Sequence, residues 1–241
     1  MKKLVLLAVT LTKVGLAGLV LVPFIPAISR AIGGTKEPLS KSLYEVRGQV
    51  RLLPPDPGQT LEDGSGVVVW LASTQTGSEP RPDSEPPHYQ IMQYHKKFEP
   101  PLLVVPTGSI VEFRNHDPWF HNVFSLSRSR QFNLGFYQAG VLKAVKFDRA
   151  GVSYLFCSIH PEMMGVVLTV DSSYFGVSDT AGHISIGNVP PGKYLLHAWY
   201  ANAPPQALEA ARRAIFVRDD RRSLPAISIA VSRRISKTTE N

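Results

Sequence analysis

The sequence predicts an all-β protein built from two small sandwiches. Proline and glycine are frequent, with 20 and 18 of the 241 residues, which favours many turns and short strands over long helices. Short apolar runs separated by turn residues recur from His88 to Val170, and a second such stretch follows Asp171. Val152, Tyr154 and Phe156 alternate with other residues, as in a strand that lies beside a core. Several short strands at this spacing are typical of a sandwich or barrel.

The first strands are expected at Val46–Leu53 and Gly66–Ala72, with proline, aspartate and glycine supplying the turn between them. Ser73–Pro87 is rich in serine, proline, glycine and charge, so we expect a linker there. The strands that we expect to follow it are 102–105, 110–114, 121–126, 142–148, 152–156 and 164–170.

The region after Asp171 is expected to begin with a hairpin. Val177–Ile186 has alternating residues around a turn at Asp179–Gly182. Further strands are expected at 194–200, 214–218 and 226–232, with one short helix at 205–213.

The N-terminus has the pattern of an export signal. Met1–Lys3 supplies the positive start, and Val14–Ile25 is an apolar stretch of suitable length. Residues 29–31 offer small side chains for cleavage after Ala31. The alternative is an uncleaved anchor over Leu4–Ile28. Either way the rest of the chain is expected outside the cytoplasm, as a periplasmic or other extracytoplasmic protein.

The charge excludes a specialised nucleic-acid binder. The formal net charge of +7 includes four basic residues among the first 31, and the remaining chain carries only +3. No basic stripe is interleaved with aromatic residues. There is also no Gly-x-Ser-x-Gly elbow, phosphate-binding glycine loop or His-Glu-x-x-His helix. The chain is therefore predicted not to be an enzyme and not to bind nucleic acid.

The segment that predicts chemistry is a short loop between two expected strands. Cys157, His160 and Met163 lie three residues apart. Cys157 is the only cysteine, so no disulfide within the chain is possible. Two histidines and a cysteine with a weak axial methionine are the ligands of a blue-copper site. His121, at the start of an expected strand, is placed to supply the second imidazole. We therefore predict one copper ion held by His121, Cys157, His160 and Met163.

Each ligand has an alternative interpretation. Cys157 could be an inert core thiol, because free cysteine is among the most buried residue types. His116 is the rival first histidine, but Asp117-Pro118 after it suggests a turn. Met164 is the rival axial ligand, and it is also the expected first residue of the next strand.

The Cys-x-x-His-x-x-Met loop resembles that of the cupredoxins, and of amicyanin in particular, over about residues 88–170. The resemblance implies a Greek-key cupredoxin β-sandwich with a type 1 copper ion. It also implies that His121, Cys157, His160 and Met163 are the ligands, and that Asn122 steadies the loops around them.

Phe132–Gly135 and Cys157–Met163 also resemble bacterial plastocyanin-like proteins, some of them labelled methylamine-utilisation proteins, that carry a carboxypeptidase-regulatory-like module. Gly48–Val50 with Gly66–Val69, and Tyr174–Tyr200, resemble parts of that module. The resemblance implies a signal peptide or anchor at 1–31, a cupredoxin domain at 88–171, and a discontinuous second β-sandwich formed by 43–80 and 172–232.

The resemblance and the ligand set together predict an exported protein that carries single electrons. His160 is expected to reach the surface through an apolar patch that docks a redox partner transiently. The patch would include Pro161 and Met164, with Trp119 and Phe120. Membrane contact is expected only if the N-terminal segment stays uncleaved. The alternatives are copper storage or delivery, and a metal-free structural envelope protein.

Overall fold

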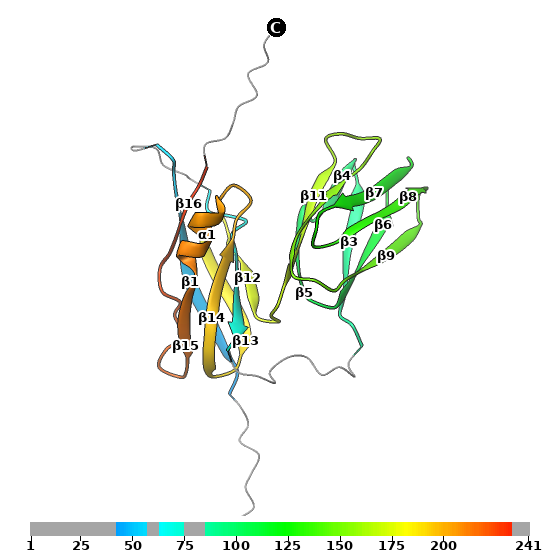
Figure 1. Ribbon diagram of the computed structural model, residues 1–241. Helices are drawn as coiled ribbons and strands as arrows, with labels where there is room; N and C mark the ends of the chain where they lie inside the picture. Colours follow the sequence, from blue (N-terminus) through cyan, green and yellow to red (C-terminus); the bar gives the residue numbers. More distant parts are fainter. Residues whose placement is uncertain (1–41, 57–62, 75–84, 233–241) are drawn as a thin grey trace, which may run out of the picture. The chain divides into compact units, whose positions relative to one another are not determined.

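The computed structural model describes residues 42–56, 63–74 and 85–232, whose regular secondary structure is all β-strand apart from one short helix. The strands form two β-sandwiches (Figure 1). This confirms the predicted all-β fold class. No helix within the described ranges is long and apolar enough to cross a membrane. The predicted signal peptide at 1–31 and most of the predicted linker lie outside the described residues.

One sandwich carries all the predicted metal ligands. Its five-stranded sheet has the order β5-β11-β10-β7-β8, and its four-stranded sheet has the order β4-β3-β6-β9. In chain order the strands are β3 (His88–Tyr94), β4 (Lys97–Glu99), β5 (Leu102–Pro106), β6 (Ser109–Asn115), β7 (His121–Leu126), β8 (Gln131–Tyr137), β9 (Leu142–Phe147), β10 (Gly151–Phe156) and β11 (Met164–Val170).

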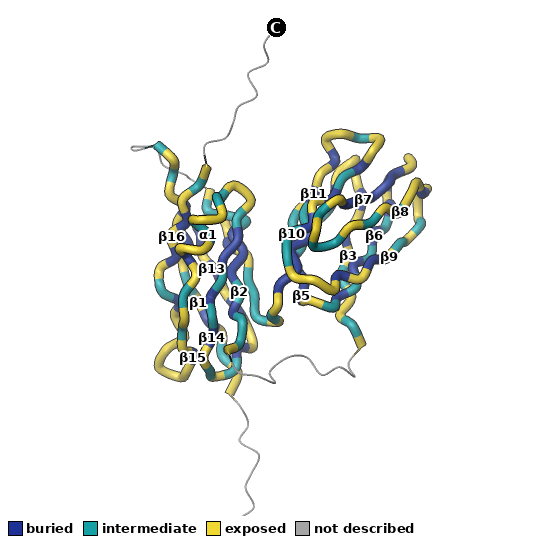
Figure 2. Tube along the Cα trace, viewed as in Figure 1, coloured by how far each residue is buried: buried dark blue, intermediate teal, exposed yellow. Residues whose placement is uncertain are grey.

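The core of this sandwich forms because alternate residues of its strands are apolar and point inward. Along β6, buried residues alternate strictly with partly exposed ones, and Val111 and Phe113 are fully buried. They pack with Phe98, Phe147 and Leu155 in one cluster that also contains Cys157 and Met163. The buried stretches of the strands are dark in Figure 2. Two of the predicted ligands are therefore continuous with the hydrophobic core.

The second sandwich consists of a three-stranded sheet, β13-β1-β16, and a four-stranded sheet, β12-β2-β14-β15. Its elements are β1 (Tyr44–Leu53), β2 (Val68–Ser73), β12 (Phe175–Val177), β13 (His183–Val189), β14 (Gly192–Trp199), α1 (Pro205–Ala211), β15 (Arg213–Val217) and β16 (Ile227–Ala230). The predicted short helix and the strands around 194–200, 214–218 and 226–232 are confirmed, with ends shifted by a few residues.

The strands of the second sandwich come from two segments of the chain, one before and one after the first sandwich. Strand β1 pairs antiparallel with β13 and parallel with β16, and β2 pairs with β12 and β14. Among the described strands, β1 and β2 form no ladder with β3–β11. An inserted first sandwich requires this pairing. The division into one domain at 88–171 and one discontinuous domain at 43–80 and 172–232 stays a prediction, as does the likeness of the latter to a carboxypeptidase-regulatory-like module.

Two predictions of local structure are wrong, and three strands were not predicted. The sequence predicts that Val152, Tyr154 and Phe156 lie beside the core, but β10 buries Ser153 and Leu155, and Tyr154 is exposed. The hairpin expected over Val177–Ile186 does not form, because β12 joins the sheet of β2 while β13 joins the sheet of β1. The Asp179–Gly182 turn exists, with the Gly182 amide donating to the Asp179 carbonyl at 2.9 Å, but it carries the chain from one sheet to the other. Strands β3, β4 and β8 were also missed.

Candidate metal centre

Cys157 lies where strand β10 meets the ligand loop. The strand presents Ser153 and Leu155 to the interior, and Cys157 continues that inward row as the first residue of the loop. Its side chain is buried and its thiol is free. The pairing of β10 with β11 ends at Phe156 and Met164. Cys157 and Met163 are therefore the next residues along the two paired strands, on either side of a five-residue connection.

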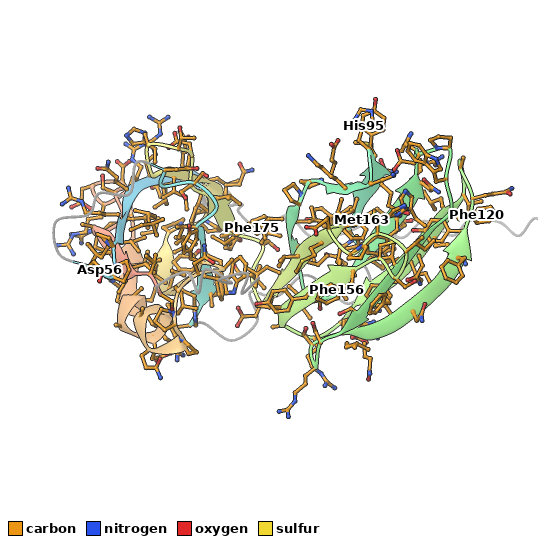
Figure 3. The ribbon with its side chains drawn as sticks, turned by 90° about the horizontal axis from the view of Figure 1, so that it is seen from above. Asp56, His95, Phe120, Phe156, Met163 and Phe175 are labelled. Carbon is orange, nitrogen blue, oxygen red and sulfur yellow. The ribbon has the colours of Figure 1, made fainter. Side chains whose placement is uncertain are left out.

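A tight turn in this connection positions His160 and Met163. The Met163 amide donates to the His160 carbonyl at 2.9 Å. Met163 is 1% exposed and packs in the same cluster as Cys157, and Figure 3 shows it in the interior of the sandwich. His160 is partly exposed at the rim. The i, i+3 spacing thus brings a thiol and an imidazole together, and Met163, at i+6, is buried in the same core cluster as Cys157.

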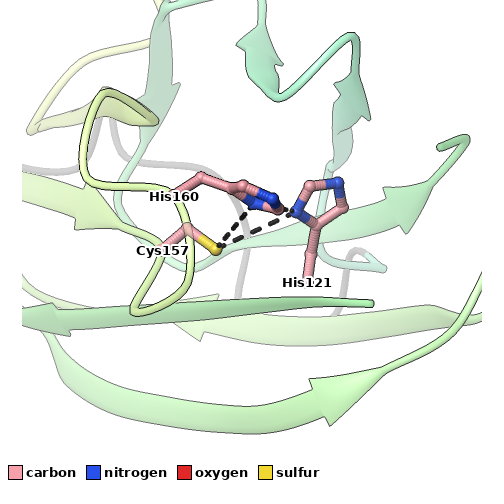
Figure 4. A group of neighbouring side chains, drawn as sticks. All are labelled: His121, Cys157 and His160. Atoms are coloured by element: carbon pink, nitrogen blue, oxygen red, sulfur yellow. Dashed lines mark hydrogen bonds between the residues drawn. The ribbon is translucent and has the colours of Figure 1, made fainter. Parts of the chain in front are cut away.

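His121 reaches the same place from a neighbouring strand. It is the first residue of β7, which pairs with β10 through Phe124 and Phe156. The antiparallel direction places His121 opposite the start of the ligand loop. Its side chain is fully buried, and its Nδ1 atom faces Cys157 and His160 (Figure 4).

The three donor atoms form a compact triangle. The Cys157 Sγ atom lies 3.9 Å from His121 Nδ1 and 3.7 Å from His160 Nδ1, and the two nitrogens are 3.2 Å apart. Donors held about 2.0–2.3 Å from one ion, at the angles of about 100–130° of a near-trigonal site, lie about 3.1–3.9 Å from each other. The triangle therefore fits a single metal ion, and one thiolate with two imidazoles suits copper.

Asn122 connects the two elements that carry the ligands. Its Oδ1 atom accepts a hydrogen bond from the Ser158 amide at 3.2 Å, and its Nδ2 donates to Asn133 Oδ1 at 2.8 Å. Asn133 in turn accepts from the Gly135 amide at 2.9 Å. Asn122 thus ties β7 to the residue after Cys157 and to β8, which is the steadying position that the resemblance implied.

The rival ligands are exposed, unlike the buried His121, Cys157 and Met163. His116 is exposed in the β6–β7 connection, and its amide donates to the Gln93 carbonyl at 2.9 Å. Met164 is the first residue of β11 and is 56% exposed. His116 does not belong to the group of His, Cys, Asp and Glu side chains close enough to hold a metal ion among the described residues, which is His121, Cys157 and His160.

Sequence reasoning missed Asp117, which it interpreted only as part of a turn. The Asp117 Oδ2 atom lies 2.8 Å from His121 Nε2, and both side chains are buried. Burial raises the pKa of Asp117, but hydrogen bonds from the Lys96 amide, the His121 ring and the His95 amide outweigh it, so this pKa lies below its usual value. Asp117 is therefore an ionised group in the interior. The four-residue spacing to His121 was the only available indication.

Electrostatics also favour a neutral His160. Burial is the main cause that lowers its pKa, and the nearby His121 and Lys96 lower it further, while Asp117 acts in the opposite direction. A neutral imidazole offers a lone pair to a metal ion, whereas an imidazolium does not.

No protein-family model and no curated protein matches this sequence. Among solved structures, a purple cupredoxin from Nitrosopumilus maritimus is 27% identical, with a TM-score of 0.31, over 34% of this chain and 98% of that one. An amicyanin variant in its copper(I) form is 22% identical, with a TM-score of 0.33, over 34% of this chain and 82% of that one. A further amicyanin variant is 20% identical, with a TM-score of 0.33, over 42% of this chain and 98% of that one. These three solved structures are cupredoxins.

Proposed function

We propose that this chain is an exported type 1 copper protein that carries single electrons between redox partners in the cell envelope. The observation that supports it is the triangle of Cys157 Sγ, His121 Nδ1 and His160 Nδ1, with sides of 3.2–3.9 Å. Met163, buried beside Cys157 in the same cluster, is the proposed axial ligand. Export rests on residues 1–31, and a non-enzymatic role rests on the absence of catalytic motifs in the sequence.

The protein would keep the copper ligands fixed in position and shielded from water. A copper ion bound by this set would supply one-electron chemistry between its two oxidation states. Cys157 and Met163 sit at the paired ends of β10 and β11, and His121 begins β7. These attachments to paired strands would limit how far the ligands move when the charge of the ion changes. Burial of His121, Cys157 and Met163 keeps water from the donor atoms.

The proposed docking surface surrounds His160. Trp119 is 48% exposed and Phe120 is 56% exposed, in the connection that precedes His121. Ile159 and Met164 are 44% and 56% exposed in and after the ligand loop. Figure 3 shows Phe120 at the outer edge of the sandwich. A small exposed apolar surface beside a ligand suits the weak, transient complexes of electron carriers.

The decisive experiment records the visible spectrum after loading the protein with copper(II). We expect an intense thiolate-to-copper band that disappears in Cys157→Ala and persists in His116→Ala, which replaces a histidine outside the triangle. Absence of the band in the folded wild-type protein would refute the proposal: weakly bound, exchangeable copper would then indicate copper storage or delivery, and no copper binding would leave a metal-free structural role.

A second measurement separates electron transfer from copper storage or delivery. The loaded protein is mixed with a small-molecule reductant, and separately with a copper chelator. An electron carrier is reduced quickly and keeps its copper. Weak copper that passes readily to the chelator would instead indicate storage or delivery.

A further inference from the structure

The His121 ring is held at both nitrogens, and only one of them faces the proposed metal. Nδ1 points to Cys157 and His160, while Nε2 lies 2.8 Å from Asp117 Oδ2. The side chains of His121 and Asp117 are 0% and 2% exposed. An acid and an imidazole that both lie out of water interact more strongly than the same pair would at the surface.

The Asp117 carboxylate is fixed by a second element of the fold. Its Oδ1 atom accepts from the His95 amide at 2.7 Å, and its Oδ2 accepts from the Lys96 amide at 2.8 Å. Both residues form the tip between β3 and β4, and both have positive φ, 52° and 57°. This left-handed turn aims two successive amides at one carboxylate. The Asp117 amide also donates to Asn115 Oδ1 at 2.9 Å.

These contacts decide which nitrogen of the ring carries the proton. A carboxylate only accepts hydrogen bonds, and a neutral imidazole has one N–H. The hydrogen of the His121 ring is therefore on Nε2, which leaves the lone pair on Nδ1, inside the triangle. A carboxylate behind a metal-binding histidine also makes the ring a stronger donor, which favours the more highly charged state of the metal.

We propose that Asp117 is a positioning residue that presets the His121 tautomer for metal binding and lowers the reduction potential of the site. The effect on the reduction potential rests on the proposed copper function. The choice of His121 tautomer concerns the protein alone and does not depend on copper.

The first test compares Asp117→Asn with Asp179→Asn. Asp179 pairs with His183 at the same four-residue spacing, at 3.5 Å, but both side chains are exposed in the other sandwich, so its variant controls for the loss of one charge. In the copper-loaded protein we expect Asp117→Asn to shift the balance toward copper(I) at least about tenfold, or about 59 mV for one electron. Asp179→Asn should leave the potential unchanged. Equal potentials in the two variants would overturn the proposal.

The second test needs no variant and no metal. Nitrogen-15 NMR of the copper-free wild-type protein distinguishes a protonated from an unprotonated ring nitrogen. We expect His121 to be protonated at Nε2 and bare at Nδ1. A hydrogen on Nδ1 with a bare Nε2 would overturn the inference. If Asp117→Asn does not bind copper, its potential cannot be compared, and the NMR measurement of the His121 tautomer decides whether the inference holds. A wild-type protein that shows this tautomer but binds no copper would refute the proposed function and leave the Asp117 contact standing.

Discussion

The connection made by Asn122 can be tested by replacing it with alanine. The substitution removes the hydrogen bond from the Ser158 amide and the one to Asn133 Oδ1. Ser158 and Asn133 are both exposed, so water can replace the lost partner in each case. The cost is then about 1 kcal/mol for each hydrogen bond. We expect the free energy of unfolding of the copper-free protein to fall by about 2 kcal/mol in urea titrations.

The same substitution should also loosen the ligand loop. The Ser158 amide adjoins Cys157, and the loss of about 1 kcal/mol there corresponds to a roughly fivefold change in an equilibrium or rate. We therefore expect copper(II) to pass to a chelator about fivefold faster from Asn122→Ala than from the wild-type protein.

Asn133→Ala is the matched control, because it removes a partner of Asn122 but leaves the hydrogen bond from Ser158. It should be destabilised, while its copper release stays close to that of the wild-type protein. The reasoning is refuted if Asn122→Ala unfolds within about 0.5 kcal/mol of wild type, or if the two variants release copper at the same rate.

Two further predictions concern the second sandwich. Gly182 has a φ of +78°, and an added Cβ would lie 2.2 Å from the Val50 carbonyl oxygen, whereas a Cβ at Gly187 meets nothing within 4 Å. Gly182→Ala should cost at least about 2 kcal/mol and Gly187→Ala almost nothing in urea unfolding, and equal effects would contradict this. His197 stacks on Trp70 at 5.0 Å, and burial lowers its pKa below 6.5. The unfolded state therefore gains its proton first as pH falls through about 6.5, and stability drops. His197→Phe should reduce the loss of thermal stability between pH ~7.5 and ~5, and an undiminished loss would count against this cause.

The part of the site that the sequence predicted well is the part encoded locally. Cys157, His160 and Met163 are separated by three residues each on one short loop, so their meeting needs only a turn between two strands. His121 required one long-range assumption, that its strand begins beside that loop. The alternation of Val152, Tyr154 and Phe156 gave no help here, because β10 buries Ser153 and Leu155 on the same side as Cys157, and Tyr154 is exposed.

Asp117 was missed because its role depends on a distant hairpin with no local sequence pattern. A two-residue turn with positive φ usually contains Asn-Gly or Asp-Gly, but here it contains His95 and Lys96. Strand β3 was not predicted because it directly follows Ser73–Pro87, which has the composition of a linker. The hairpin around the Asp179–Gly182 turn was wrongly predicted for a different reason, since the residues of this turn suit both a hairpin and a crossing between sheets.

The contacts around the triangle bear on how copper would be used. Each donor is fixed within the protein: His121 by the Asp117 carboxylate, Cys157 by its place at the end of β10, and His160 by the turn to the Met163 amide. A protein that delivers copper needs ligands that can move apart to release the ion. A protein that transfers electrons needs ligands that keep their places when the charge of the ion changes. The fixed donors therefore favour electron transfer over delivery, and the chelator experiment tests this preference directly.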